Sequence, residues 1–274
     1  MRKIALIVNF DKENAFEGAL ELKSLLQGKA ELYCSREDSE KLGLPCFDTD
    51  EQLFSECGVT AVLGGDGTII STAKRSAPYK SILLGINMGH LGYLATFDRT
   101  MLNDAAKLLI SDDICYDNRF MLKAEIYNGN KLSETFHALN EFVFSRGNSS
   151  HLMNFTVTSS DKTVCCYRAD GIIAATPTGS TAYSLSAGGP ILAPDADAML
   201  LTPICPHMLR ARSIVLPPEA ITVTSDRMFC FSSDGQDERI LSEDNHVIIE
   251  KSPYTVRLAH SAELSFFDIL QKKL

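Results

Sequence analysis

The sequence has no excess of positive charge. Its 26 lysines and arginines stand against 35 aspartates and glutamates, which gives a formal net charge of −9. A protein that binds the phosphate backbone of DNA or RNA needs clustered cations, so this balance argues against a nucleic-acid partner. A small anionic ligand can still be held locally by main-chain amides and a few cations.

The chain also lacks an apolar run long enough to cross a membrane. The apolar residues 4–8 follow Met1-Arg2-Lys3, as the core of a signal peptide would. The run is too short for that, and Asp11-Lys12-Glu13 follows without a small-residue cleavage site. We therefore expect a first β-strand here, no membrane partner and a cytoplasmic protein.

Eight cysteines are present, but no Cys-x-x-Cys pair or His-rich stretch accompanies them. This scatter predicts reduced thiols that mostly fill the core, and it argues against a disulfide framework or a zinc site. No residue is predicted as a metal ligand. The cysteines are Cys34, Cys46, Cys57, Cys115, Cys165, Cys166, Cys205 and Cys230.

Several signatures of known enzyme classes are absent. There is no Gly-x-x-x-x-Gly-Lys-Ser/Thr phosphate loop and no protein-kinase motif set. Residues 65–70 begin like the dinucleotide-binding fingerprint but lack its third glycine, which disfavours an NAD-dependent oxidoreductase. Ser180 lacks the Gly-x-Ser-x-Gly context of a serine hydrolase.

Two differently patterned halves make up the chain. The first alternates continuous apolar strands with helical periodicity, which is typical of an α/β layer with a parallel sheet. The second consists of short alternating strands with turn signals such as Asn128-Gly129, which predicts an all-β domain. We expect an α/β domain over residues 1–98, joined by a closing helix at 260–274, and a β-rich domain over 99–259.

A glycine-rich turn follows the strand predicted at 59–63. Gly64, Gly65 and Gly67 surround Asp66, Thr68 follows, and the chain then winds as a helix. Glycine permits close approach of a ligand to the main chain, and a helix N-terminus favours anions. Gly-Gly and Asp-Gly are also common turn dipeptides, so the pentapeptide alone fits a tight turn equally well.

Two polar stretches interrupt the β-rich half. Residues 176–184 form a cluster of small hydroxyl residues with a tyrosine, which suits a flat heterocycle but also fits a Ser/Thr-rich loop. The pair Asn140-Glu141 lies in an apolar strand and has the donors and acceptors to bind a ribose diol, or it is a polar strand end. Asp234-Gly235 reads first as a hairpin turn.

Taken together, these stretches resemble the NAD kinases, which phosphorylate the adenosine-ribose 2′-hydroxyl of NAD to make NADP. The resemblance covers nearly the whole chain. Its most specific part is Thr176-Pro177-Thr178-Gly179-Ser180-Thr181-Ala182-Tyr183, since the glycine turn is shared with lipid kinases and phosphofructokinases. Asn140-Glu141 and the closing helix with Phe266-Phe267 complete it.

The resemblance implies an N-terminal α/β domain and a C-terminal β-sandwich-like domain, with NAD between them. It further implies ATP or polyphosphate as the second substrate, a divalent cation, usually Mg²⁺, and a homodimer or homotetramer. Asp66 is similar to the catalytic base, and the turn to a phosphate-binding site formed by Gly64, Gly65, Gly67 and Thr68. The implied NAD-binding residues are Gly67, Tyr93, Asn140, Glu141, Arg168, Asp170, Thr178, Thr181, Ala182, Tyr183, Ser186 and Asp234.

One departure from the family pattern is visible. The family's usual Gly-Phe-Leu/Tyr before an acidic residue is here Gly92-Tyr93-Leu94-Ala95-Thr96, without the carboxylate. Two other functions remain as alternatives: a lipid kinase of the diacylglycerol type, and a non-catalytic regulator that binds NAD. The net negative charge and the hydroxyl-rich stretch speak against the first, and the presence of Asp66 speaks against the second.

Overall fold

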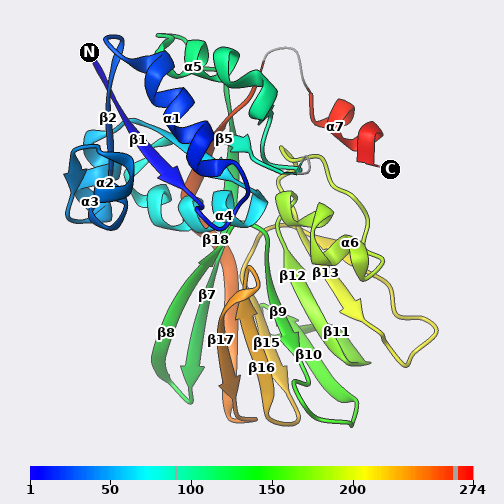
Figure 1. Ribbon diagram of the computed structural model, residues 1–274. Coiled ribbons are helices and arrows are strands. Elements are labelled where there is room, and N and C mark those ends of the chain that lie inside the picture. The colour runs from blue at the N-terminus through cyan, green and yellow to red at the C-terminus, as the bar shows by residue number, and fades with distance from the viewer. Residues whose placement is uncertain (90–91, 262–264, 274) are drawn as a thin grey trace. The chain divides into compact units, whose positions relative to one another are not determined.

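The protein is described by a computed structural model that covers residues 1–89, 92–261 and 265–273 (Figure 1). The chain forms two compact units: unit 1 comprises Met1–Arg119 with Tyr254–Leu274, and unit 2 comprises Phe120–Pro253. The sequence placed the boundaries at 98/99 and 259/260. The difference arises because the helix at 102–110 packs in the core of unit 1, so the chain leaves this unit later than its pattern change indicates.

Unit 1 is built on a parallel sheet in the order β3-β2-β1-β4-β5. The end of β18 and the short β6 pair with β5, also in parallel. The strands are β1 (Arg2–Val8), β2 (Ala30–Ser35), β3 (Cys46–Phe47), β4 (Val59–Gly64), β5 (Ile82–Asn87), β6 (Phe97–Asp98) and β18 (Asn245–Ala259). The continuous apolar strands at 3–9, 59–63 and 81–87 are thus confirmed as neighbours in a parallel sheet.

Helices cover both faces of this sheet, because its strands are apolar on both sides. α1 (Ala15–Leu26) and α5 (Leu102–Ile110) share a core with Leu6 and Leu84 on one face. α3 (Asp50–Glu56) and α4 (Asp66–Ser76) contact each other, and Ile69 of α4 touches Gly85, which points to the other face. Unit 1 also contains α2 (Arg36–Leu42) and α7 (Phe266–Lys273). Of the closing helix predicted at 260–274, residues 260, 261 and 265 are not helical, and residues 262–264 and 274 lie outside the described residues.

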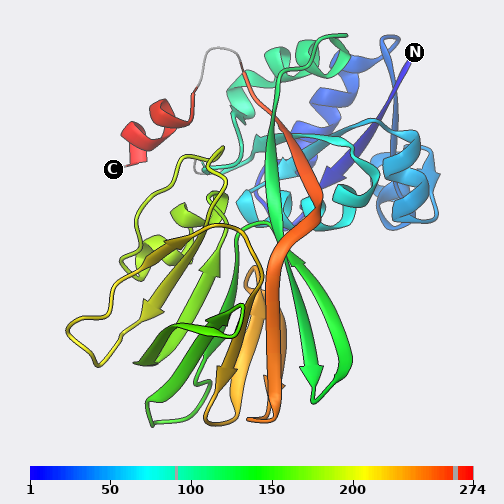
Figure 2. The same cartoon turned by 180° about the vertical axis from the view of Figure 1, so that it is seen from behind.

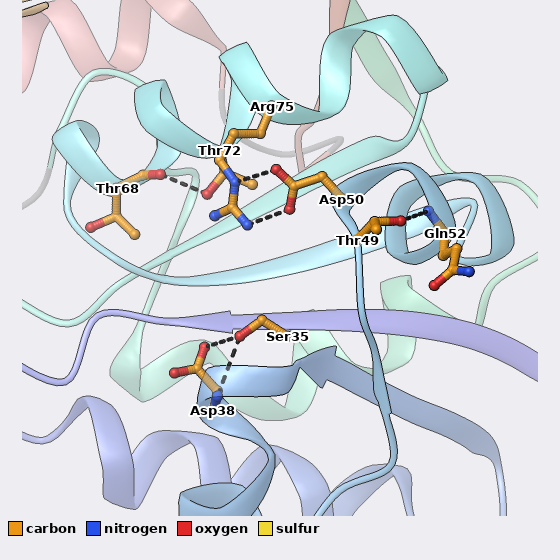
Figure 3. A network of polar contacts seen from close by, with 8 residues as sticks. All are labelled: Ser35, Asp38, Thr49, Asp50, Gln52, Thr68, Thr72 and Arg75. Carbon is orange, nitrogen blue, oxygen red and sulfur yellow. Dashed lines mark hydrogen bonds and ion pairs between the residues drawn. The ribbon is translucent and has the colours of Figure 1, made fainter.

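Local polar contacts fix the helices around this sheet (Figure 3). The Arg75 guanidinium of α4 donates two hydrogen bonds to the Asp50 carboxylate at the start of α3, one of them with Nε–Oδ2 at 2.8 Å. Thr49 caps α3 by accepting the Gln52 N–H. These contacts join the last turn of α4 to the first turn of α3.

Unit 2 is a sandwich of two sheets. One has the order β11-β10-β15-β18-β7-β8 and the other β14-β13-β12-β9-β16-β17. β18 is one long strand (Figure 2), whose residues 247–249 pair with β15 and whose residues 257–258 belong to unit 1. The other strands are β7 (Tyr116–Asn128), β8 (Lys131–Ala138), β9 (Glu141–Ser145), β10 (Met153–Ser159), β11 (Lys162–Ala169), β12 (Gly171–Ala175), β13 (Met199–Ile204), β14 (Ile214–Leu216), β15 (Ile221–Ser225), β16 (Phe229–Ser233) and β17 (Gln236–Leu241).

Buried phenylalanines join the two sheets of unit 2. The ring of Phe155 on β10 meets that of Phe229 on β16 at 6.3 Å and nearly at a right angle. Phe142, Phe144 and Phe231 add three more rings from the second sheet to the same core. The predicted combination of an N-terminal α/β domain with a C-terminal β-sandwich-like domain is confirmed. Among the described residues, no helix has the length and apolar character needed to span a membrane.

Candidate functional site

The glycine turn lies at the carboxyl end of β4, where the chain enters α4. Gly64 is the last residue of the strand, Gly65 is the N-cap, and Asp66 is the first helical residue. A side chain at Gly64 would place its Cβ 2.4 Å from Thr68 Oγ1, so the tight turn requires glycine there. Gly67 is exposed, and a Cβ built on it would have no atom within 4 Å. The turn therefore offers accessible main chain at the positive end of an 11-residue helix, where anions are favoured.

The carboxylate of Asp66 is anchored by main-chain amides from another part of unit 1. Its Oδ2 accepts the Tyr93 N–H at 2.7 Å, and its Oδ1 accepts the Leu94 N–H at 3.3 Å. A Cβ at Gly92 would lie 1.8 Å from Oδ1, so glycine is required for this close approach. The segment 92–94 thus wraps the carboxylate, and this explains how an aspartate is accommodated beside an anion-favouring helix terminus.

Tyr93 was predicted to contact NAD through its ring. The structure brings Tyr93 to Asp66 through its main-chain N–H. The Nζ of Lys273 in α7 lies 4.3 Å from the centre of its ring, a distance at which cation–π attraction acts. The closing helix therefore contacts the segment that holds Asp66.

Two residues near the turn were not singled out by the sequence. Asn9, directly after β1, donates from Nδ2 to Thr68 Oγ1 at 3.0 Å and accepts the Asp11 N–H. The Cε of Lys12 lies 3.8 Å from the position of a Cβ on Gly65. Parallel neighbours β1 and β4 end at the same sheet edge, and this pairing brings Lys12 to the glycine turn. The polar residues directly after the first apolar strand could have indicated from the sequence that this segment belongs to the site.

In unit 2, Asn140 and Glu141 stand at the start of β9 with their main chain held on several sides. The Asn140 carbonyl accepts the Thr176 N–H at 2.8 Å, and the Leu139 carbonyl accepts the Thr176 hydroxyl at 2.6 Å. A Cβ on Gly179 would lie 2.1 Å from the Asn140 oxygen, so the hydroxyl-rich stretch packs directly on the pair. The strand end and the stretch at 176–184 therefore lie directly against each other.

The side chains of the pair keep unsatisfied acceptors. Asn140 Oδ1 and Glu141 Oε2 are buried and have no hydrogen-bond partner among the described residues. An unpaired buried polar atom costs about 1–3 kcal/mol, so the pair is suited to a ligand that brings polar partners for these two oxygens. Burial and the nearby Asp234 charge raise the pKa of Glu141 to about 8, while an N–H from Tyr183 opposes this rise.

The hydroxyl-rich stretch is a pair of short helical turns. Thr178–Thr181 form a 3-10 turn and Tyr183–Ser186 form α6, with Ala182 between them. The Thr181 hydroxyl donates to the Thr178 carbonyl at 3.2 Å. Tyr183 is 45% exposed, so a ligand can reach part of its side chain.

Asp234 is the first residue of the turn between β16 and β17, with a left-handed backbone at φ 51°. The turn prediction is correct, but the carboxylate also reaches back to β9. It accepts the N–H groups of Leu139, Asn140 and Glu141 at 2.9, 2.8 and 3.0 Å. Its contribution to the site is therefore a contact with main chain.

The other predicted contacts are distributed around the edges of β11, β12 and α6. Asp170 lies between β11 and β12, and its Oδ1 accepts the Arg146 Nε–H at 2.7 Å, a partner that the sequence did not indicate. Arg168 and Ser186 are exposed. No described contact joins these last two to Asn140 or Glu141.

Comparison with known proteins gives a consistent result for both units. Residues 4–114 match the ATP-NAD kinase N-terminal domain, and residues 139–261 match the ATP-NAD kinase C-terminal domain. The NAD kinase of Symbiobacterium thermophilum is 38% identical over 280 residues, covering 100% of this chain and 99% of that protein. The NAD kinase of Prosthecochloris aestuarii is 36% identical over 277 residues, covering 99% and 96%.

Solved structures share the fold. The crystal structure of yeast NADH kinase complexed with NADH has a TM-score of 0.89 at 24% identity, covering 99% of this chain and 86% of that one. An NAD kinase from Archaeoglobus fulgidus in complex with ATP has a TM-score of 0.77 at 21% identity, covering 100% and 98%. Together with the full-length relatives, these matches confirm the resemblance read from the sequence: the chain is an enzyme that belongs to the NAD kinase family.

Proposed function

We propose that the protein transfers a phosphoryl group from ATP to the 2′-hydroxyl of the adenosine ribose of NAD, giving NADP. The observation that carries this proposal is the anchored carboxylate of Asp66, fixed by two main-chain N–H groups at the first residue of α4 and adjoining the exposed Gly67. Phosphoryl transfer needs mainly positioning and compensation of charge, and a turn of this kind supplies both.

Asp66 acts as the base in this proposal. A ribose hydroxyl loses its proton as it attacks phosphorus, and a carboxylate at about 2.6–3.2 Å assists that loss. The N–H groups of Tyr93 and Leu94 hold the carboxylate in one orientation. A base that does not have to be ordered at the moment of reaction loses less entropy in the transition state.

Gly64, Gly65, Gly67 and Thr68 form the phosphate site. The helix terminus and the open main chain at Gly67 favour the donor's phosphates. Lys12 beside Gly65 adds a positive charge to the same place. Polyphosphate presents the same phosphate chemistry as ATP, so it is a second candidate donor.

Unit 2 binds NAD in this proposal. Asn140 and Glu141 offer two side-chain oxygens that have no partner among the described residues, and Tyr183 offers a partly exposed ring for stacking. Thr178, Thr181 and Ala182 shape the adjoining turns. Gly67, Tyr93, Arg168, Asp170, Ser186 and Asp234 remain candidate contacts on the strength of the family resemblance.

Mg²⁺ enters the proposal as the cation that accompanies the donor phosphates. The described residues contain no group of three or more His, Cys, Asp or Glu side chains that would cage a metal. Mg²⁺ usually needs only one or two carboxylates together with substrate phosphates, so the donor set fits an ion carried by ATP.

The assembly and location are also part of the proposal. We propose a cytoplasmic homodimer or homotetramer; the eight free cysteines are consistent with a reducing compartment. Light scattering measures the assembly directly.

One assay tests the activity. The purified protein is incubated with NAD, ATP and Mg²⁺, and NADP is read with a dehydrogenase that accepts only NADP. The proposal expects NADP to accumulate in proportion to enzyme and time. Phosphorylation of diacylglycerol with no NADP would identify a lipid kinase, and NAD binding with no phosphorylation would identify a regulator. Repeating the assay with polyphosphate, and with NADH in place of NAD, defines both substrates.

A further inference from the structure

We propose that Asp234 is a positioning residue, whose carboxylate holds the main chain of residues 139–141 so that Asn140 and Glu141 present their unpartnered oxygens to NAD. This inference rests on the proposed function, because it assigns a role within the NAD site. It replaces direct contact between Asp234 and NAD with an action through the neighbouring pair.

The Asp234 carboxylate is already engaged by the protein's own main chain. It accepts three main-chain N–H groups from consecutive residues at 2.8–3.0 Å, and the Asp234 N–H donates to the Glu141 carbonyl at 2.9 Å. Charge-assisted hydrogen bonds of this kind are roughly twice as strong as neutral ones. A carboxylate with three such donors has little capacity left for a ligand.

The main chain and the side chains of Asn140 and Glu141 differ in their hydrogen bonding. The main chain of 139–141 is bonded to Asp234 on one side and to Thr176 on the other. The side-chain oxygens Asn140 Oδ1 and Glu141 Oε2 are buried, and no residue that the structure describes hydrogen-bonds to them. Glu141 is only 6% exposed, so it cannot turn to water for compensation. The contacts of Asp234 therefore hold the main chain of the pair while its two side-chain oxygens remain available to polar groups of a ligand.

The charge of Asp234 also acts on the Glu141 carboxyl group. The titratable group that acts on Glu141 is Asp234, and the Tyr183 N–H faces it from α6. Burial first and the Asp234 charge second raise the pKa of Glu141. Removing the charge at position 234 should lower the pKa of Glu141. A loosening of the turn that kept this charge would not have that electrostatic effect.

The test uses the left-handed backbone of position 234. Asparagine and glycine both adopt φ near 51° readily, so Asp234→Asn and Asp234→Gly retain the turn while they weaken or remove the hydrogen bonds of the Asp234 carboxylate. We expect NAD affinity, measured by calorimetry on the full-length protein, to fall roughly tenfold in each. Asp161→Asn is the matched control, because Asp161 is exposed in another hairpin turn of unit 2 with a left-handed backbone at φ 62°. Its NAD affinity should equal that of the wild type.

A double-mutant cycle separates the two roles of Asp234. If it acts through the pair, adding Asp234→Asn to a variant that carries both Asn140→Ala and Glu141→Ala should leave NAD affinity within about twofold of that variant, since coupled residues are not additive. Multiplication of the two losses would show direct contact with NAD and overturn the proposal.

A second readout needs no NAD. The pH at which Glu141 titrates, followed by the pH dependence of unfolding, should move to lower pH in Asp234→Asn and stay unchanged in Asp161→Asn. An unmoved midpoint in folded Asp234→Asn would overturn the proposal. Wild-type NADP formation is measured separately, so failure of the proposed function is distinguishable from failure of the positioning role proposed for Asp234.

Discussion

The two polar regions of this protein satisfy their carboxylates in opposite ways. In unit 1, the oxygens of Asp66 accept N–H groups from Tyr93 and Leu94, so the functional side chain itself is held. In unit 2, the main chain around Glu141 is held by Asp234, while the Glu141 side chain keeps a buried, unpaired oxygen.

The difference indicates a separate role for each region. A carboxylate held by amides keeps a fixed geometry, which suits a group that takes a proton in the transition state. A buried acceptor without a partner is costly until a ligand supplies a donor, which suits substrate binding. Changes in the first region should therefore affect turnover, and changes in the second should affect affinity.

The largest effect is expected from Asp66→Asn. Loss of a general base lowers kcat by roughly 10²–10⁴-fold, and the amide preserves the shape of the side chain. Steady-state NADP formation measures the change. Asp104→Asn is the matched control, because Asp104 also lies in the first turn of a helix in unit 1 and is exposed. Turnover close to wild type in Asp66→Asn would contradict the catalytic role assigned to Asp66.

Gly92→Ala should lower kcat by about 10²-fold, since a displacement of about 1 Å at a reacting group has that effect. The added Cβ would lie 1.8 Å from Asp66 Oδ1, so the carboxylate or the segment must move. Gly89→Ala serves as the control, because its Cβ would meet its nearest neighbour at an ordinary 3.8 Å. Equal turnover in the two variants would show that the wrapping of Asp66 by residues 92–94 has no catalytic importance.

Tyr183→Ala should raise KM for NAD by roughly three- to tenfold and leave kcat close to wild type. A stacking contact of about 0.5–1.5 kcal/mol acts on ground and transition states alike. Tyr183→Phe keeps the ring and should retain the wild-type KM. An effect confined to kcat would contradict the assignment of Tyr183 to binding.

The smallest effect concerns stability and pH. The pKa of Glu141 is about 8 in the folded protein against an ordinary 4.5, so the folded state holds a proton that the unfolded state has lost in this range. The stabilising contribution is complete below about pH 4.5 and is lost as pH rises through 8, by at most about 1.4 kcal/mol per pH unit. Chemical denaturation across this pH range should show that the free energy of unfolding of Glu141→Gln falls less steeply with rising pH than that of the wild type. Glu238→Gln, at an exposed position, should follow the wild type.

The α/β layer was predictable because its strands are continuous apolar runs and its turns carry glycine. α2 was missed, although Ser35 caps it and Gly43 ends it in a left-handed conformation, because its charged sequence shows no apolar face. β13 and β14 were also not predicted, although Pro206 follows the first and Pro217-Pro218 follows the second.

The site was predictable to the extent that its residues are contiguous. The glycine turn, Asn140-Glu141 and the stretch at 176–184 are each visible as short motifs. The contacts of Asp66 with Tyr93 and Leu94 were not predictable, because they are made by main chain 27 and 28 residues away. The contacts of the Asp234 carboxylate with the main chain of 139–141 were not predictable for the same reason, because they depend on the pairing of β9 with β16. Long-range main-chain contacts leave no local pattern in a sequence.

The central claim is that the first region performs chemistry and the second binds NAD. The most direct test measures NAD affinity by calorimetry and single-turnover NADP formation in the same two variants, Asp66→Asn and Glu141→Gln. The account predicts that Asp66→Asn keeps its affinity within about twofold while its single-turnover rate falls at least about 100-fold. For Glu141→Gln it predicts weaker NAD binding with a larger share of the rate retained at saturating NAD. Loss of affinity in Asp66→Asn with an unchanged single-turnover rate would contradict it.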